Sequence, residues 1–249
     1  MKVAILSDLH IGCPPVPGAF GHPPRAFADY LARLLDTHDQ LVLNGDIFQS
    51  DHQLIPGITS QRAAIARAVD ANPWLHDVLE LDQTTLLRGN HDDETQRVLG
   101  AGVRHMVDGP VGRLVVTHGD VHDPVIGTAP GISALATWSS GRIRRIGLGR
   151  LAQWLEGRDI AIKGARFSGP AGAYARGAAV ELAQHNAQVV VFGHTHQPAL
   201  LTLARGIYAN PGSASLGHRA HVSVDLSEGR VHVEVDGRVW GEERLDAVR

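Results

Sequence analysis

The stretch LLRGNHDDETQ, residues Leu86–Gln96, decides how the rest of the chain is interpreted. An apolar run, Thr84–Leu87, leads into it, and a short helical segment is expected from Glu94. Gly, Asn and Asp are ordinary turn formers, so a surface turn could have the same composition. A buried strand that ends in Asn90, His91 and Asp92, however, places several side chains that can bind a metal or transfer a proton at one point.

The overall composition is that of an ordinary folded protein: 249 residues, 43% hydrophobic, 20% charged, with a net charge of −3. This near-neutral balance disfavours a nucleic-acid-binding domain, which is usually basic. The single cysteine excludes an internal disulfide and favours a cytoplasmic protein. Ser7 and Asp8 interrupt the N-terminal apolar run too early for a signal peptide. No apolar stretch approaches the roughly 20 residues that a membrane-spanning helix needs.

Short runs rich in Val, Ile and Leu alternate with helical patterns, which is typical of an α/β fold. The runs expected to form buried strands are Val3–Leu6, Leu41–Leu43, Thr85–Leu87, Leu114–Thr117 and Val189–Phe192. Apolar residues three and four apart predict helices over about 25–36, 62–71 and 174–184, with Pro73 ending the second. The alternating segment 221–237 predicts an antiparallel hairpin, so the sheet is mixed or there are two sheets.

The segment from about residue 123 to 176 contains many glycines and no convincing strand. It also separates two strand signals by more than a normal connection. We therefore expect a single domain over 1–249 with a helical cap inserted at about 123–176. Its basic residues (Arg142, Arg144, Arg145, Arg150, Arg158, Lys163, Arg166 and Arg176) are interleaved with apolar ones such as Leu148, Leu151, Trp138 and Trp154. This pattern suits an anionic partner with apolar parts, such as a lipid at an interface, and a plain lid packed on the domain is an equal alternative.

Each expected strand is followed by residues that can bind a metal: Asp8, His10, Asp46, Asn90, His118, His194 and His196. A lone motif of this kind is common in turns, but five in succession, each after a strand, are not. Strand ends of an open α/β sheet line one crevice, and imidazole, carboxylate and amide ligands together favour Mn, Fe or Zn. Seven ligands exceed what one ion needs. We therefore expect two divalent transition-metal ions, with Mn as the first choice, that share a carboxylate.

The order D-x-H, G-D, G-N-H-D, H and G-H-x-H resembles the signature of the calcineurin-like metallophosphoesterases, over roughly residues 3–215. The resemblance implies a four-layer α/β/β/α sandwich of two mixed sheets. It also implies two ligand sets bridged by one carboxylate: Asp8, His10 and His196; Asn90, His118 and His194; and Asp46 between them. The turn ANPGSAS, residues 209–215, is similar to the family's late turn, with a structural role for Asn210.

The chemistry that such a centre supports is hydrolysis at phosphorus. Two ions roughly 3.5–4 Å apart can hold both oxygens of an in-line displacement and convert a bridging water into the attacking hydroxide. The leaving oxygen then needs a proton. His91 is the candidate acid, and Asp92 is the candidate residue that orients its ring. We therefore expect hydrolysis of a phosphodiester or pyrophosphate bond in a phosphate-containing small molecule or lipid.

For other polar residues near the motifs we expect supporting roles. Asp120 and Asp123 are candidates for supporting contacts with the ligands, and His122 for contact with substrate. Surface-like patterns surround several further histidines, which are not expected to act: His38, His76, His185 and His232.

The insertion and the lead-in SDLHIG resemble in particular the UDP-2,3-diacylglucosamine diphosphatase branch of this family. That resemblance implies a nucleotide-lipid substrate and peripheral membrane contact through the cap. His91 departs from the branch, which carries Arg at this position. A nuclease or nucleotide phosphodiesterase would use the same metals, with the basic insertion binding a phosphate backbone. A non-catalytic scaffold on the same fold would have lost ligands that this sequence retains. The sequence leaves the substrate and the oligomeric state open.

Overall fold

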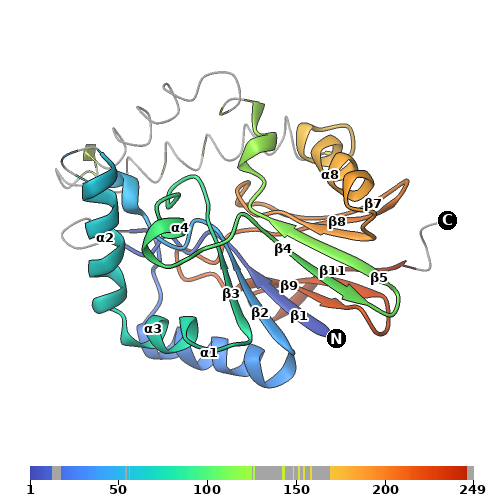
Figure 1. Cartoon of the computed structure of the whole chain (residues 1–249), viewed down its shortest axis with the longest axis horizontal. Helices are drawn as coiled ribbons and strands as arrows, with labels where there is room; N and C mark the ends of the chain where they lie inside the picture. Colours follow the sequence, from blue (N-terminus) through green and yellow to red (C-terminus); the bar gives the residue numbers. More distant parts are fainter. Residues whose placement is uncertain are drawn as a thin grey trace.

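The computed structural model describes residues 1–12, 18–53, 55, 57–124, 126, 142–143, 148, 151, 154, 158 and 169–245. These residues form two sheets packed face to face, with helices on the outer side of each sheet (Figure 1). The four-layer α/β/β/α sandwich of two mixed sheets is therefore confirmed. The cap expected at about 123–176 lies largely outside the described residues.

The first sheet contains six strands in the order β11-β10-β9-β1-β2-β3. The strands are β1 (Lys2–Leu6), β2 (Gln40–Asn44), β3 (Thr84–Leu87), β9 (Ala220–Asp225), β10 (Arg230–Val235) and β11 (Arg238–Arg244). β1, β2 and β3 are parallel, and β9 joins β1 in the antiparallel sense. β9 and β10 form the hairpin expected over 221–237. The edge strand β11 was not predicted, because its mostly exposed side chains lack a buried alternating row.

The second sheet contains five strands in the order β4-β5-β6-β8-β7. The strands are β4 (Arg104–Gly109), β5 (Gly112–Thr117), β6 (Val189–Val191), β7 (Pro198–Leu203) and β8 (Gly206–Pro211). β5, β6 and β8 are parallel and central. Their neighbours β4 and β7 are antiparallel edge strands that the apolar runs did not reveal, since both are partly exposed. The buried strand β8 was not predicted either, because its apolar run, 207–209, is short.

The helices are α1 (Pro24–Thr37), α2 (Ile58–Asp70), α3 (Pro73–Leu79), α4 (Thr95–Val98) and α8 (Ala173–Gln184), with 3₁₀ turns η1 (Ser50–His52) and η2 (Asp120–His122). α2 begins at Ile58, earlier than the periodicity indicated, and ends before Pro73 as expected. Pro73 instead occupies the first turn of α3, where its missing N–H removes no helix hydrogen bond. None of the helices among the described residues has both the length and the apolar character required to cross a bilayer.

The core has three apolar layers, and β1 shows how the sequence builds them. Ala4 and Leu6 pack toward the helices α1–α3, whereas Val3 and Ile5 pack between the two sheets. This alternation is the two-residue period of a strand. Because both faces are covered, the parallel strands appear in the sequence as continuous apolar runs. A third layer joins the second sheet to α8, with Tyr174 and Leu182 at its centre.

Candidate metal centre

The candidate site lies where the carboxyl ends of the parallel strands of both sheets meet. The loops after β1 and β2 run together, since the Asp8 N–H donates to the Gly45 carbonyl at 3.1 Å. The two sheets are joined here as well, because the Asn44 side chain donates to the Thr117 carbonyl at 3.1 Å. Residues that lie far apart in the chain are therefore brought to one seam.

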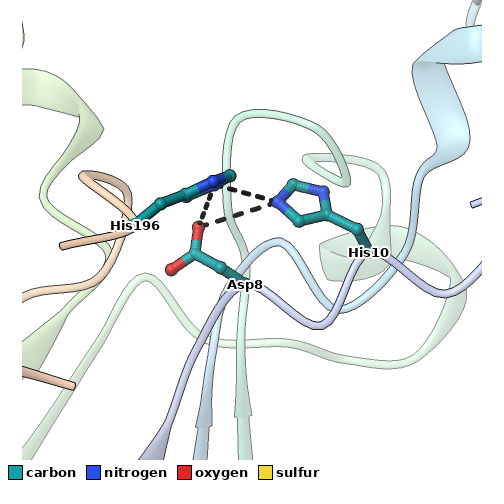
Figure 2. A group of neighbouring side chains, drawn as sticks. All are labelled: Asp8, His10 and His196. Carbon is teal, nitrogen blue, oxygen red and sulfur yellow. Dashed lines mark hydrogen bonds and ion pairs between the residues drawn. The ribbon is translucent and has the colours of Figure 1, made fainter. Parts of the chain in front are cut away.

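Asp8, His10 and His196 form the first group of potential ligands (Figure 2). The Nε2 atoms of the two histidines are 3.0 Å apart, and they lie 3.9 Å (His10) and 3.1 Å (His196) from Asp8 Oδ1. Ligand atoms around one ion with bonds of about 2.1 Å are separated by roughly 3.0–3.4 Å, so this triangle has nearly the required size. The second carboxylate oxygen of Asp8 contacts the Ser7 hydroxyl and the His194 N–H, which leaves Oδ1 for the centre.

Asp46, His118 and His194 form the second group. The Asp46 Oδ2 atom lies 3.2 Å from His118 Nε2, and both residues are almost completely buried. The other oxygen of Asp46, Oδ1, accepts the backbone N–H of His91 at 2.8 Å. The carboxylate is thereby fixed with one oxygen directed to the histidine.

Several polar atoms of the site are buried without a hydrogen-bond partner among the described residues. They are Asp8 Oδ1, Asp46 Oδ2, Asn90 Oδ1, His118 Nε2 and His194 Nδ1. Leaving such an atom unsatisfied costs about 1–3 kcal/mol. Such atoms fit divalent cations, which accept electron pairs from carboxylate, amide and imidazole groups alike. Six of the seven sequence-predicted ligands lie in the two groups, and the seventh, Asn90, has a buried Oδ1 atom without a partner.

Two of the histidines are oriented by polar groups that contact the ring nitrogen opposite the candidate ligand atom. His118 Nδ1 lies 2.9 Å from the Asn44 carbonyl, and His194 Nε2 lies 2.9 Å from Asp123 Oδ2. The Tyr174 hydroxyl donates to the same Asp123 oxygen at 3.2 Å. Carboxylate or carbonyl partners of this kind commonly fix the tautomer and the angle of a metal-binding imidazole.

The other polar residues near the motifs have separate contacts. Asp120 pairs with Arg88 at 3.1 Å rather than with a candidate ligand. His122 stacks on Phe192 with ring centroids 5.1 Å apart. Asn210, which is fully buried, donates to the Gly193 carbonyl at 2.6 Å and so supports the turn that carries His194.

The backbone of the site is unusual, because five candidate ligands adopt left-handed conformations. The φ angles are 59° for Asp8, 49° for His10, 52° for Asp46, 67° for His194 and 57° for His196. A positive φ costs on the order of 1–3 kcal/mol in a non-glycine residue and persists only where the surrounding fold enforces it. Such strain is concentrated at functional sites.

The glycines that precede the ligands act in two different ways. Gly45 has a φ of 78°, so it makes a sharp turn before Asp46. Gly89 has no such φ. Its missing side chain provides space instead, because a Cβ atom there would overlap the Asp46 carboxylate.

His91 lies at the edge of the site, and its ring contacts Asp51. The distance from His91 Nδ1 to Asp51 Oδ2 is 2.7 Å, and Gln49 Nε2 lies 3.0 Å from the same nitrogen. The Ser50 hydroxyl donates to the His91 carbonyl at 2.7 Å. The loop after β2 therefore holds this ring. Sequence reasoning did not identify Asp51, because nothing local to it indicates a contact with a residue forty positions away.

Asp92, expected to orient His91, has other partners. Its buried carboxylate accepts the backbone N–H groups of Ile47 at 2.7 Å, Phe48 at 3.1 Å and Gly89 at 2.7 Å, and a longer one from Asp46 at 3.3 Å. Asp92 thus ties the loop after β2 to the loop after β3. Carboxylate oxygens accept hydrogen bonds, so Asp92 can satisfy several backbone N–H groups at once. Its side chain therefore contacts the backbone of these loops instead of the ring of His91.

The electrostatics of the site favour the charged forms of Asp8 and Asp46, whereas burial, with Asp46 nearby, raises the pKa of Asp92 to about 7. Burial raises the pKa of Asp46, but His118 and His91 outweigh burial and hold the pKa well below its usual range. Burial, with His196 and His91, lowers the pKa of His10 to about 3, so its ring is neutral. Burial lowers the pKa of His118, but Asp46 outweighs it and raises the pKa to about 10. A cation that binds His118 would therefore displace a proton.

Comparisons with known proteins agree with this fold. The sequence model of the calcineurin-like phosphoesterase family matches residues 1–198. The chain is similar to the solved structure of YfcE, a phosphoesterase from E. coli, with 18% identity over 98% of this chain and 100% of that chain and a TM-score of 0.50. It is also similar to Vps29 from Chaetomium thermophilum, with 13% identity over 98% and 96% of the two chains and a TM-score of 0.49. At 18% identity the likeness to YfcE concerns the fold alone. A search of curated proteins found no match.

Proposed function

The chain belongs to the calcineurin-like phosphoesterase family, and from this premise we propose that it hydrolyses phosphodiester or pyrophosphate bonds with two divalent transition-metal ions. The observation that carries the proposal is the convergence of buried ligand atoms that make no hydrogen bond of normal geometry, such as Asp8 Oδ1, Asp46 Oδ2 and His118 Nε2. Buried polar atoms are rarely left without partners, and here cations would supply them.

The proposed ligands divide into two sets that share one carboxylate: Asp8, His10 and His196; Asn90, His118 and His194; and Asp46 between them. This mixture of nitrogen and oxygen donors suits Mn²⁺, Fe²⁺ or Zn²⁺ better than Mg²⁺ or Ca²⁺. When bound, the two ions would stabilise the charge on the phosphoryl oxygens and lower the pKa of an attacking water.

His91 is the proposed donor of the proton that the leaving oxygen requires. Burial lowers its pKa, but the carboxylates of Asp51 and Asp46 outweigh burial and raise the pKa to about 10. The ring is therefore held in its protonated form, as a general acid must be. We assign the orienting role to Asp51, whose carboxylate contacts Nδ1 and leaves Nε2 as the donor. Asp92 would act indirectly, by fixing the two loops that carry Asp46 and His91.

The substrate class is proposed from the described residues of the insertion. Leu148, Leu151 and Trp154 are exposed by 48%, 44% and 55%, and they lie three residues apart. The Arg158 guanidinium lies 5.0 Å from the centre of the Trp154 ring. Apolar side chains beside a fixed positive charge favour an anionic substrate with apolar parts, such as a UDP-diacylglucosamine-type nucleotide lipid. Peripheral contact with a lipid surface would use the same residues.

Two other functions use the same fold. A metal-dependent nuclease or nucleotide phosphodiesterase would bind its phosphates through the basic insertion, with affinity that falls steeply as salt is added. A non-catalytic scaffold would not require the two groups of potential ligands, which contain six residues, five of them in strained backbone conformations. We therefore favour the enzyme.

The proposal is tested by assaying the purified chain on bis(p-nitrophenyl) phosphate with and without Mn²⁺. We expect hydrolysis that Mn²⁺ stimulates, that chelation abolishes, and that Asp46→Asn removes together with metal binding. Asp93→Asn is the matched control, because Asp93 is exposed and pairs with Arg88 outside both ligand groups. A screen of nucleotide lipids, cyclic nucleotides and linear nucleotides would then identify the substrate class. Full activity of Asp46→Asn would exclude the two-ion centre.

A further inference from the structure

Another group of metal-ligand side chains lies on β9 and β10 and shares no residue with the centre described above. His221, His232 and Glu234 each offer one ligand atom, and these atoms lie within 4.8 Å of one another. The strand register explains their proximity. His221 is the direct cross-strand partner of Glu234, and His232 lies two residues before Glu234 on the same face.

This group faces the α1 side of the first sheet. The alternate residues of the two strands, including Val222 and Val233, pack between the sheets, so the polar row points the other way. There the Tyr30 hydroxyl of α1 lies 3.0 Å from His221 Nδ1. A hydrogen bond donated by Nδ1 to the tyrosine oxygen would leave Nε2 with its lone pair, an arrangement common for metal-binding histidines.

The surroundings of the group favour a bound ion. His221 is only 3% exposed, and its ring lies among those of Tyr30, His38 and His232, with ring centroids 6.1, 6.1 and 6.2 Å away. A cavity of about 180 Å³ adjoins His232 and is lined also by Lys2, His38, Ser223, Asp225 and Arg230. Of the three residues of the group, His232 lines this cavity, so water molecules can reach this ligand.

We propose that His221, His232 and Glu234 bind a further divalent ion of the Zn²⁺ class. Two imidazoles and one carboxylate form a donor set typical of Zn²⁺, and three protein ligands leave one position for solvent. The ion would join β9 to β10 and, through the hydroxyl of Tyr30, support the contact of α1 with the sheet.

The experiment is a count of Zn²⁺ ions per chain after equilibrium dialysis of the native protein. We expect His232→Ala and Glu234→Gln each to bind one ion fewer than the wild type. Both side chains are half-buried, so neither change removes a core residue, and circular dichroism would verify the fold. His76→Ala is the matched control, because His76 is an exposed histidine on α3 and should leave the count unchanged.

A double variant separates this site from the proposed catalytic centre. Asp46→Asn should lose ions of that centre, and adding His232→Ala should remove one more, whether or not the chain is a phosphoesterase. Equal Zn²⁺ contents in the wild type, His232→Ala and Glu234→Gln would overturn the proposal.

Discussion

The Nδ1 atom of His91 lies 2.7 Å from Oδ2 of Asp51, so this ring is held by the loop after β2 and not by its neighbour in the sequence, Asp92. The two aspartates consequently have separable effects. Asp51 acts on the protonation and orientation of His91, whereas Asp92 acts on the backbone of two loops.

Replacing His91 tests its proposed role as the acid. We expect His91→Ala to retain its metal ions and to lose about 10²–10⁴-fold in kcat on a substrate with a poor leaving group. The loss should shrink with p-nitrophenolate as leaving group, since that group departs without a proton. Equal losses on both substrates would show that His91 binds phosphate rather than donating a proton.

Replacing Asp51 tests the contact with His91 through the pH profile. Asp51 raises the pKa of His91, so Asp51→Asn should lower that pKa. Because a general acid is active only while protonated, the alkaline limb of the kcat profile should move to lower pH, by about one unit or more. Asp93→Asn, which alters an exposed carboxylate nearby, should leave the limb in place. An unchanged limb in Asp51→Asn would contradict the assignment.

Replacing Asp92 should affect stability even when no metal is present. Asp92→Ala removes the acceptor of several buried N–H groups, so we expect the free energy of unfolding to fall by on the order of 4 kcal/mol. Urea unfolding in the presence of chelator measures this directly. Asp93→Ala, next in the sequence but exposed, should change stability by less than about 0.5 kcal/mol. Comparable effects of the two variants would exclude the loop-tying role.

The buried histidine of β9 predicts a loss of stability in acid for the metal-free protein. Burial lowers the folded-state pKa of His221 to about 3, whereas its unfolded value is close to 6.5. The unfolded chain therefore takes up the proton first, so stability is intact above pH 6.5 and is lost as the pH falls toward 3. Between about pH 7.5 and 5 the wild type should lose about 2 kcal/mol more than His221→Asn. Unfolding curves at the two pH values check this, with His76→Asn as the exposed control.

The exposed residues of the insertion predict a substrate-dependent defect. Trp154→Ala should leave hydrolysis of bis(p-nitrophenyl) phosphate within a few-fold of the wild type, because a small reporter does not reach a remote apolar contact. Hydrolysis of a diacylated nucleotide lipid should fall on the order of tenfold or more, a loss of about 1.4 kcal/mol. Trp240→Ala is the control, since Trp240 is a similarly exposed tryptophan on β11. A parallel fall on both substrates would show that Trp154 only supports the fold.

The sequence predicted those parts of the molecule that local patterns encode. Most of the covered strands were visible as apolar runs, although the fully buried β8 was not among them. The candidate ligands were chosen because each stands shortly after such a run, as His194 does after β6. The strands β4, β7 and β11 were missed because edge strands are partly exposed and carry no continuous apolar signal. Contacts such as Asp51 with His91, or Tyr30 with His221 across 191 positions, depend on how loops and helices pack. No periodicity in the sequence records them.

The position of β1 in the first sheet has a consequence for the order in which the protein can be assembled. β1 lies between β2 and β9, so the strand that carries Asp8 acquires its second neighbour only from residues 220–225. During synthesis, the loops that carry the candidate ligands leave the ribosome before β9 does. At that stage one edge of β1 would still lack a hydrogen-bonded neighbour. Pairings across such sequence separations form slowly, because the intervening chain must first be closed into a loop. The late hairpin β9–β10 thus provides the second neighbour of β1, the strand that precedes Asp8. The hairpin itself contains none of the seven candidate ligands of the proposed catalytic centre.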